Sequence, residues 1–250
     1  MKKLLASILV LGFIFTGCSK SDDVLVLGTN AEYPPFEYIA PNEEGVIGKY
    51  DGLDMQIAKA IGKELGKEVV IEDMPFDSLI VALTGGKVDA IISAMTITDE
   101  RKENVDFTSP YFTSEQYILV AKDDTTITSG EDLAGKSIGV QMGTTGDFIA
   151  TDNIENSDVR RYNRPVDAVL DLKNGKIDAV LTDSGVAGLY AEEYSDSVNL
   201  ITDTSTFEVE EYGIGVAKGD TELLEALDVA VKRLVDEGKI TEWYMEYNAE

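Results

Sequence analysis

The sequence has no histidine, a single cysteine and few basic residues, with 21 Lys and Arg against 47 Asp and Glu and a formal net charge of -26. Without histidine, the chain cannot build a Ser-His-Asp or Cys-His catalytic group, and it lacks the commonest zinc ligand. One cysteine leaves no disulfide within the chain. The acidic balance argues against nucleic acid as a partner, because nucleic-acid binding requires a basic surface. We therefore expect no metal, no cofactor and no nucleic acid.

The N-terminus has the pattern of an export signal. Two lysines precede an apolar run over residues 4–15, which is too short for a comfortable membrane span. The following Thr-Gly-Cys18 resembles the lipobox of bacterial lipoproteins, which usually have Leu where Phe15 stands. We expect a signal peptide over residues 1–17, lipidation of Cys18 and a tether over residues 18–23. The alternative is a plain signal peptide followed by an unmodified cysteine.

The rest of the chain alternates between strand patterns and helix patterns. Its length allows one or two domains, and an apolar content of 44% is ample for a core. Residues 24–28 read as a strand, and residues 52–65 read as an amphipathic helix that Asp51 caps and Gly66 ends. This alternation predicts parallel, doubly wound sheets.

One stretch, residues 93–101, has the composition of a ligand site. It reads Ser-Ala-Met-Thr-Ile-Thr-Asp-Glu-Arg, follows a predicted buried strand at 88–92 and opens a helix capped by Thr98 or Asp99. Open α/β sheets bind ligands at such places, outside the carboxyl ends of the strands. Small hydroxyls, backbone N–H groups and the Arg101 guanidinium suit a carboxylate. Taken alone, the stretch fits an ordinary strand-loop-helix with a solvated charge run equally well.

A second copy of this unit favours the ligand site. Residues 83–93, Leu-Thr-Gly-Gly-Lys-Val-Asp-Ala-Ile-Ile-Ser, are similar to residues 172–182, Leu-Lys-Asn-Gly-Lys-Ile-Asp-Ala-Val-Leu-Thr. The first copy leads to Arg101, and the second leads directly to Asp183. Two such units facing each other would place a cation and an anion on opposite sides of a zwitterion. The Gly/Thr turn at 141–147 adds the N–H groups of a helix start, although alone it could be a plain cap.

Residues 24–248 resemble the extracellular solute-binding proteins for polar amino acids that serve ABC importers. The resemblance rests on the order and spacing of short motifs, each of them weak alone. The motifs are Gly-Thr-Asn-Ala-Glu-Tyr-Pro-Pro-Phe-Glu at 28–37, Asp-Gly-Leu-Asp at 51–54, Gly-Lys-Val-Asp-Ala at 86–90, and the segments 96–101, 106–111, 143–145 and 211–215. The resemblance implies an α/β fold of two lobes, as in periplasmic binding proteins, and gives the chain a free amino acid and an ABC permease as partners.

The resemblance also assigns ten residues to the ligand. They are Asn30, Tyr33, Phe76, Ser93, Ala94, Thr96, Arg101, Gln141, Thr145 and Asp183. Arg101 would take the α-carboxylate, helped by the N–H groups of Thr96 and Thr145. Asp183 would take the α-ammonium, helped by the Thr96 hydroxyl and the Ala94 carbonyl. Some relatives have Ser in place of Ala94, but only its carbonyl is needed.

The ligand side chain would lie between Tyr33 and Phe76. A planar guanidinium suits two aromatic faces, and Asn30, Ser93 and Gln141 offer oxygen acceptors at its far end. We therefore expect a basic amino acid, arginine ahead of lysine. Asn30 stands where many relatives with basic ligands have Asp, so neutral amides could equally well hold glutamine.

The expected lobes are interleaved in the sequence. Lobe 1 comprises residues 24–112 and 213–250, lobe 2 comprises residues 116–210, and the hinge crosses at 113–115 and 211–212. We expect the lobes to close on the ligand, because each brings one charge of the clamp. The protein would be a monomeric, membrane-anchored lipoprotein outside the cytoplasm. The alternatives on this fold are a cyclohexadienyl dehydratase-type enzyme, for which the sequence offers no clear catalytic acid, a sensor domain and a structural lipoprotein.

Overall fold

The computed structural model describes residues 23–202 and 206–249. The predicted signal peptide, Cys18 and all but the last residue of the predicted tether lie outside the described residues. In the described part of the chain, no helix combines the length and the apolar character needed to cross a bilayer.

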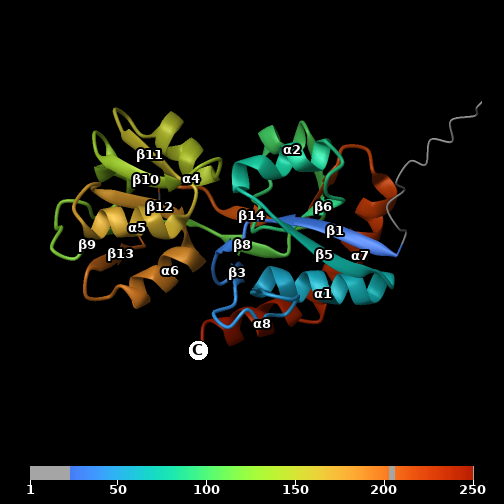
Figure 1. Cartoon of the computed structure of the whole chain (residues 1–250). Helices are drawn as coiled ribbons and strands as arrows, with labels where there is room; N and C mark the ends of the chain where they lie inside the picture. Colours follow the sequence, from blue (N-terminus) through green and yellow to red (C-terminus); the bar gives the residue numbers. More distant parts are fainter. Residues whose placement is uncertain (1–22, 203–205, 250) are drawn as a thin grey trace, which may run out of the picture.

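The first lobe is built on a five-stranded sheet in the order β5-β1-β6-β15-β7 (Figure 1). Its strands are β1 (Val24–Thr29), β5 (Glu68–Asp73), β6 (Ala90–Ile91), β7 (Val105–Phe107) and β15 (Gly215–Ala217). Its helices are α1 (Leu53–Leu65), α2 (Leu79–Thr84), α3 (Asp99–Lys102), α7 (Thr221–Asp236) and α8 (Lys239–Tyr247). In Figure 1, α2 lies on one side of the sheet and α1 and α8 lie on the other. A small sheet of β2 (Glu32–Tyr33), β3 (Glu37–Ile39) and β4 (Tyr50–Asp51) completes the lobe.

The second lobe has a sheet of the same size, in the order β11-β10-β12-β9-β13. Its strands are β9 (Gln116–Ala121), β10 (Ser137–Gln141), β11 (Asp158–Tyr162), β12 (Ala179–Asp183) and β13 (Val198–Ile201). Its α-helices are α4 (Thr145–Phe148), α5 (Pro165–Lys173) and α6 (Ser184–Glu193). The two lobes are therefore separate α/β units, as the sequence predicts.

Both sheets are mixed, so the expectation of parallel sheets is wrong for one strand of each lobe. In lobe 1, β15 runs antiparallel to its neighbours β6 and β7. In lobe 2, β9 runs antiparallel to β12 and β13. Each of these strands follows directly on a strand that lies between the lobes. β9 and β15 lead away from the region between the lobes. They must therefore run opposite to the neighbouring strands whose carboxyl ends point toward that region.

A pair of antiparallel strands lies between the two large sheets. β8 (Phe112–Ser114) pairs with β14 (Glu210–Tyr212), with Glu210 opposite Ser114 and Tyr212 opposite Phe112. Figure 1 shows both strands in the region between the lobes. The residues predicted as the hinge lie in or beside these strands. Their movement, and the lobe boundaries drawn from the sequence, stay predictions.

Helix α1 shows how the sequence pattern fixes an element. Leu53, Ile57 and Ile61 are spaced along one face, and all three are buried. Gly66 ends the helix in the left-handed conformation, with its N–H bonded to the Gly62 carbonyl. The predicted cap by Asp51 is wrong: the N-cap is Gly52, because Asp51 is the last residue of β4 and its carboxylate accepts the Gly52 N–H at 2.7 Å.

Candidate functional site

A small chamber lies between the lobes and is lined by nine of the ten predicted residues. Its volume is about 10 Å³, roughly the room for one water molecule. Lobe 1 contributes Tyr33, Phe76, Ser93, Ala94, Thr96 and Arg101, and lobe 2 contributes Gln141, Thr144, Thr145 and Asp183. The structure thus brings the two predicted halves of the clamp to one place, and the lobes must separate before an amino acid can enter it.

The tenth residue, Asn30, lies behind the chamber. Its side-chain oxygen accepts a hydrogen bond of 2.7 Å from Gln141 Nε2, and its own amide nitrogen donates to the Met74 carbonyl at 3.0 Å. Gln141 also donates to the Asn163 carbonyl at 3.1 Å. Among the described residues, the buried Oε1 of Gln141 has no partner. Both N–H donors of the Gln141 amide are therefore used, and its unpartnered oxygen at the edge of the chamber suits a ligand that donates.

The segment after β6 is fixed by carboxylates beneath it. The Ser93 hydroxyl accepts the Asn30 N–H at 3.0 Å and donates to Glu37 Oε1 at 2.9 Å. Ala94 has a φ of +42°, a left-handed conformation that is uncommon for residues other than glycine. Its N–H is held by Asp54 Oδ2 at 2.8 Å. These contacts fix the positions of Ser93 and Ala94, which both line the chamber.

Glu37 and Asp54 form a buried acidic pair, and the sequence reasoning gave neither residue a role. Burial raises the pKa of Asp54 to about 7, and burial followed by the nearby Asp54 charge raises the pKa of Glu37 well above its usual range. Asp54 also accepts the Tyr111 hydroxyl at 3.0 Å. Both shifts favour the protonated form of the carboxyl groups. Both residues lie in recognised motifs, and a carboxylate inside an otherwise apolar pattern was the signal that could have revealed them.

Arg101 projects into the chamber from the short helix α3. The Thr98 hydroxyl accepts the Arg101 N–H at 3.1 Å, which confirms Thr98 as the N-cap. The guanidinium donates to the carbonyls of Thr96 at 2.7 Å and of Gly143 at 3.1 Å, and it lies 5.4 Å from the Phe76 ring centre. Burial lowers the pKa of Arg101. Across residues 23–202 and 206–249 it has no ion-pair partner within 4 Å, so this buried cation is held by neutral groups and remains available to an anion.

Asp183 faces Arg101 from the end of β12. It is 4% exposed and accepts hydrogen bonds from the side chains of Gln116 and Tyr212. Burial and then the charge of Glu210 raise the pKa of Asp183 to about 7. A ligand ammonium group that binds here would displace the proton of the Asp183 carboxyl and pair with the resulting carboxylate.

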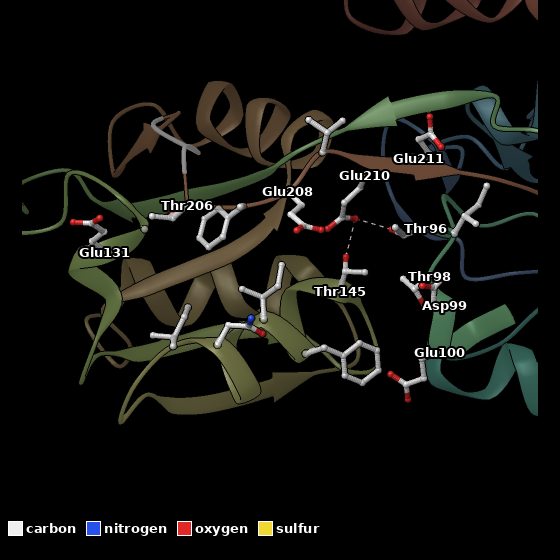
Figure 2. A pocket seen from close by; sticks show the side chains of 18 of the residues that line it. Thr96, Thr98, Asp99, Glu100, Glu131, Thr145, Thr206, Glu208, Glu210 and Glu211 are labelled. Atoms are coloured by element: carbon white, nitrogen blue, oxygen red, sulfur yellow. Dashed lines mark hydrogen bonds between the residues drawn. The ribbon is translucent and has the colours of Figure 1, made fainter. Parts of the chain in front are cut away.

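Glu210, at the start of β14, is a charged residue of this site that sequence reasoning missed. Its carboxylate accepts hydrogen bonds from the hydroxyls of Thr96 at 2.7 Å and Thr145 at 2.8 Å (Figure 2). It also accepts one from Gln116 Nε2 at 3.0 Å. Thr96 and Thr145 come from opposite lobes, so Glu210 joins the lobes directly. Along the strand, Glu210 and Tyr212 are buried and Glu211 between them is exposed. In the sequence, the available signal for the burial of Glu210 was the aromatic Tyr212 two positions later, because residues i and i+2 of a strand share a face.

A larger cavity adjoins the chamber, with a volume of about 1150 Å³. Thr96 and Thr145 line both spaces, and Glu210 lines the larger one (Figure 2). The hydrogen bonds of Glu210 therefore form a wall between them. Among the described residues, the lining of the larger cavity contains no lysine or arginine.

Another cross-lobe contact involves Tyr33. Its hydroxyl lies 3.3 Å from the Thr182 hydroxyl, at the end of β12. Burial raises the pKa of Tyr33 well above its usual range, so the phenol stays neutral and can donate. A cation and neutral carbonyls on one side, an anion on the other and aromatic rings between them form a site complementary to a zwitterion with a side chain.

The family model for bacterial extracellular solute-binding proteins, family 3, matches residues 25–250. The chain belongs to this family. A family 3 protein acts outside the cytoplasm, as the family's description states. The two-lobe fold and the site between the lobes are consistent with that assignment.

Curated relatives of this family 3 protein carry different ligand names. It is 34% identical over 240 residues to the arginine-binding extracellular protein ArtP of Bacillus subtilis, covering 91% of this chain and 90% of the relative. It is 32% identical over 222 residues to the L-cystine-binding protein TcyJ of Escherichia coli, covering 88% of this chain and 81% of the relative.

Solved structures of similar proteins confirm the fold of this family 3 protein. An ancestral arginine-binding protein bound to glutamine has a TM-score of 0.79 and 39% identity, with coverage of 91% of this chain and 99% of that one. The ancestral amino-acid-binding protein AncCDT-1, a precursor of cyclohexadienyl dehydratase, has a TM-score of 0.81 and 37% identity, with coverage of 90% and 95%.

Proposed function

We propose that this family 3 protein binds a basic amino acid, arginine ahead of lysine, by closing its lobes, and delivers it to an ABC permease. The observation that carries the proposal is the placement of Arg101 and Asp183 on opposite lobes of one buried chamber. Each is 4–5% exposed, so each is desolvated when the lobes are shut. The ligand's two backbone charges are then bound fully only in the closed form, which shifts the population toward closure.

The other contacts of the chamber support the roles expected from the resemblance. Arg101 binds the α-carboxylate with the N–H groups of Thr96 and Thr145. Asp183 binds the α-ammonium with the Thr96 hydroxyl and the Ala94 carbonyl. Figure 2 shows the side chains of Thr96, from lobe 1, and Thr145, from lobe 2, both directed at the Glu210 carboxylate.

The preference for a guanidinium rests on the far end of the chamber. The buried Gln141 Oε1 lacks a partner within the described residues and accepts from an N–H donor. Phe76 already lies against one guanidinium, that of Arg101, at 5.4 Å. A second planar cation between Phe76 and Tyr33 continues that arrangement. A relative named for arginine supports the same choice.

Glutamine is the second candidate ligand. The far end of the chamber is made of neutral amides, and an ancestral arginine-binding protein of 39% identity has been solved with glutamine bound. Calorimetric titration of the refolded protein with arginine, lysine, histidine, glutamine and cystine decides between them. Tighter binding of glutamine or cystine than of both arginine and lysine would end the basic assignment and leave the clamp of Arg101 and Asp183 standing.

Two further experiments test the transport role. Mass spectrometry of the ligand that co-purifies with the mature protein identifies the cargo directly. A turnover assay with prephenate and arogenate, run beside the titration, separates a binding protein from a dehydratase; product formation would overturn the proposal.

The membrane anchor is part of the proposal and depends on Cys18. It is the sole cysteine and follows an apolar export segment. Two acyl chains hold a protein stably on a membrane, and one holds it only marginally. Cys18→Ser is therefore expected to move the protein from the membrane fraction to the soluble fraction. A variant that stays with the membrane would disprove the anchor.

A further inference from the structure

The closed cleft contains two carboxylates and one guanidinium. Asp183 and Glu210 both accept hydrogen bonds from Nε2 of Gln116, which is fully buried between them. Arg101 is the only cationic side chain that lines the chamber among the described residues. When the two carboxylates are ionised, these three side chains together carry one net negative charge.

No other cation neutralises Glu210 within the described residues. Glu210 as a residue is 7% exposed, and its carboxylate forms no ion pair within 4 Å and is held by the two threonine hydroxyls and the Gln116 amide. The larger cavity on its other side is lined by further acidic residues, among them Asp99, Glu100 and Glu208. The charge of Glu210 is therefore felt by whatever occupies the chamber, because buried charges are screened much less than exposed ones.

This charge distinguishes ligands by their side chains. The α-ammonium and α-carboxylate of any amino acid cancel each other, so a neutral amino acid leaves the charge of Arg101, Asp183 and Glu210 at minus one. A basic amino acid brings one additional positive charge, which balances these three side chains. Asn30 supplies no acidic countercharge at the far end of the chamber, whereas Glu210 brings a negative charge from the strand between the lobes, beside Thr96 and Thr145.

We propose that Glu210 is a specificity-determining residue, whose carboxylate orients the hydroxyls of Thr96 and Thr145 and selects amino acids with a cationic side chain over neutral ones of the same shape. This inference rests on the proposed function. Glu210 acts through the two hydroxyls and through its field, so its role is that of a positioning residue.

The test compares arginine with citrulline in Glu210→Gln. Citrulline has nearly the shape of arginine with a neutral urea in place of the guanidinium, and Gln keeps an oxygen to accept from the threonines. In calorimetry, the variant is expected to lose about tenfold or more in arginine affinity while its citrulline affinity changes less than about threefold. The matched control is Glu208→Gln, which removes the same charge from an exposed residue on the same segment. It is expected to leave the ratio of arginine affinity to citrulline affinity unchanged.

Each outcome decides the inference. An equal loss for both ligands would show that Glu210 only holds the lobes together, and an unchanged ratio would show that its charge is not sensed; either overturns the proposal. Glu210→Asp retains the charge and must retain the arginine preference even if overall affinity falls. If Glu210→Gln does not fold, the same titrations of Glu210→Asp and of the parent test the proposal. A parent that binds citrulline as tightly as arginine refutes the selection of cationic side chains by Glu210. A parent that binds no amino acid at all refutes instead the proposed function.

Discussion

The side-chain amide of Gln141, on β10 of lobe 2, donates a hydrogen bond of 2.7 Å to the side-chain oxygen of Asn30, on lobe 1. Both residues were expected to reach the ligand side chain. The structure gives them different positions: Gln141 lines the chamber and Asn30 holds Gln141 from behind. Because this bond crosses the lobes, it must break when they separate and form again when they close.

Removing either charge of the clamp is expected to abolish amino-acid binding and to leave the fold intact. Arg101→Ala leaves the buried Asp183 without its counterpart across the ligand, and Asp183→Asn removes the partner of the ammonium. The loss of one member of a desolvated pair costs about 3–5 kcal/mol. Calorimetry measures the affinity, and Arg160→Ala, at an arginine exposed on lobe 2, is the matched control. Binding within about tenfold of the parent, a loss of only about 1.4 kcal/mol, contradicts the clamp.

Ligand is expected to contract the molecule. A chamber of about 10 Å³ in the closed form admits no amino acid, so binding proceeds through separated lobes and ends in closure. Small-angle scattering should give a smaller radius of gyration at saturating arginine than without it. Arg101→Ala at the same arginine concentration serves as the unresponsive control. Superimposable profiles of the parent with and without arginine would rule out closure.

Arginine affinity is expected to rise with pH between about 6 and 8. The pKa of Asp183 is raised to about 7, chiefly by burial, and the ammonium of the ligand needs the ionised form. When the ligand-free lobes are closed, a proton must leave Asp183 on binding below that pKa, so affinity falls by about tenfold for each further pH unit. Calorimetric titrations in two buffers of different ionisation enthalpy count the protons released for each arginine bound. We expect close to one proton at pH 6 and close to none at pH 8. An affinity that stays constant across this range would contradict the coupling.

The buried pair of Glu37 and Asp54 yields a prediction with its own control. Asp54→Ala removes the acceptor of both the Ala94 N–H and the Tyr111 hydroxyl, and each unsatisfied buried group costs about 1–3 kcal/mol. We expect a lower melting temperature and weaker arginine binding. Glu37→Gln imitates the protonated acid, still accepts from Ser93 and should bind within about threefold of the parent. Equal losses in the two variants would show that the pair does not position Ala94.

The charges of the clamp could be predicted from the sequence because they follow local patterns. Arg101 and Asp183 each stand after a short copy of one strand-and-turn unit, and the motifs place both near the ends of buried strands. The same locality explains the helix start at Thr98 and the helix end at Gly66. Signals of this kind are carried by a few neighbouring residues, so a sequence displays them.

What could not be predicted depends on contacts between distant segments. Glu210 meets Thr96 across 114 residues and Thr145 across 65. Nothing beside Glu210 in the sequence indicates those partners. The direction of β9 and β15 was missed for a similar reason, since it depends on where the chain enters each sheet and not on the pattern of either strand.

The order of the strands has a consequence for how the chain folds after export. The sheet of lobe 2 is made of one continuous segment, from β9 to β13. It can form as soon as that segment has crossed the membrane. Lobe 1 cannot complete its sheet at that time, because β15 must still insert between β6 and β7. Contacts between segments far apart in sequence form slowly, and domains generally fold as units. Lobe 2 is thus expected to fold first, with the edge of β6 open until the last segment arrives.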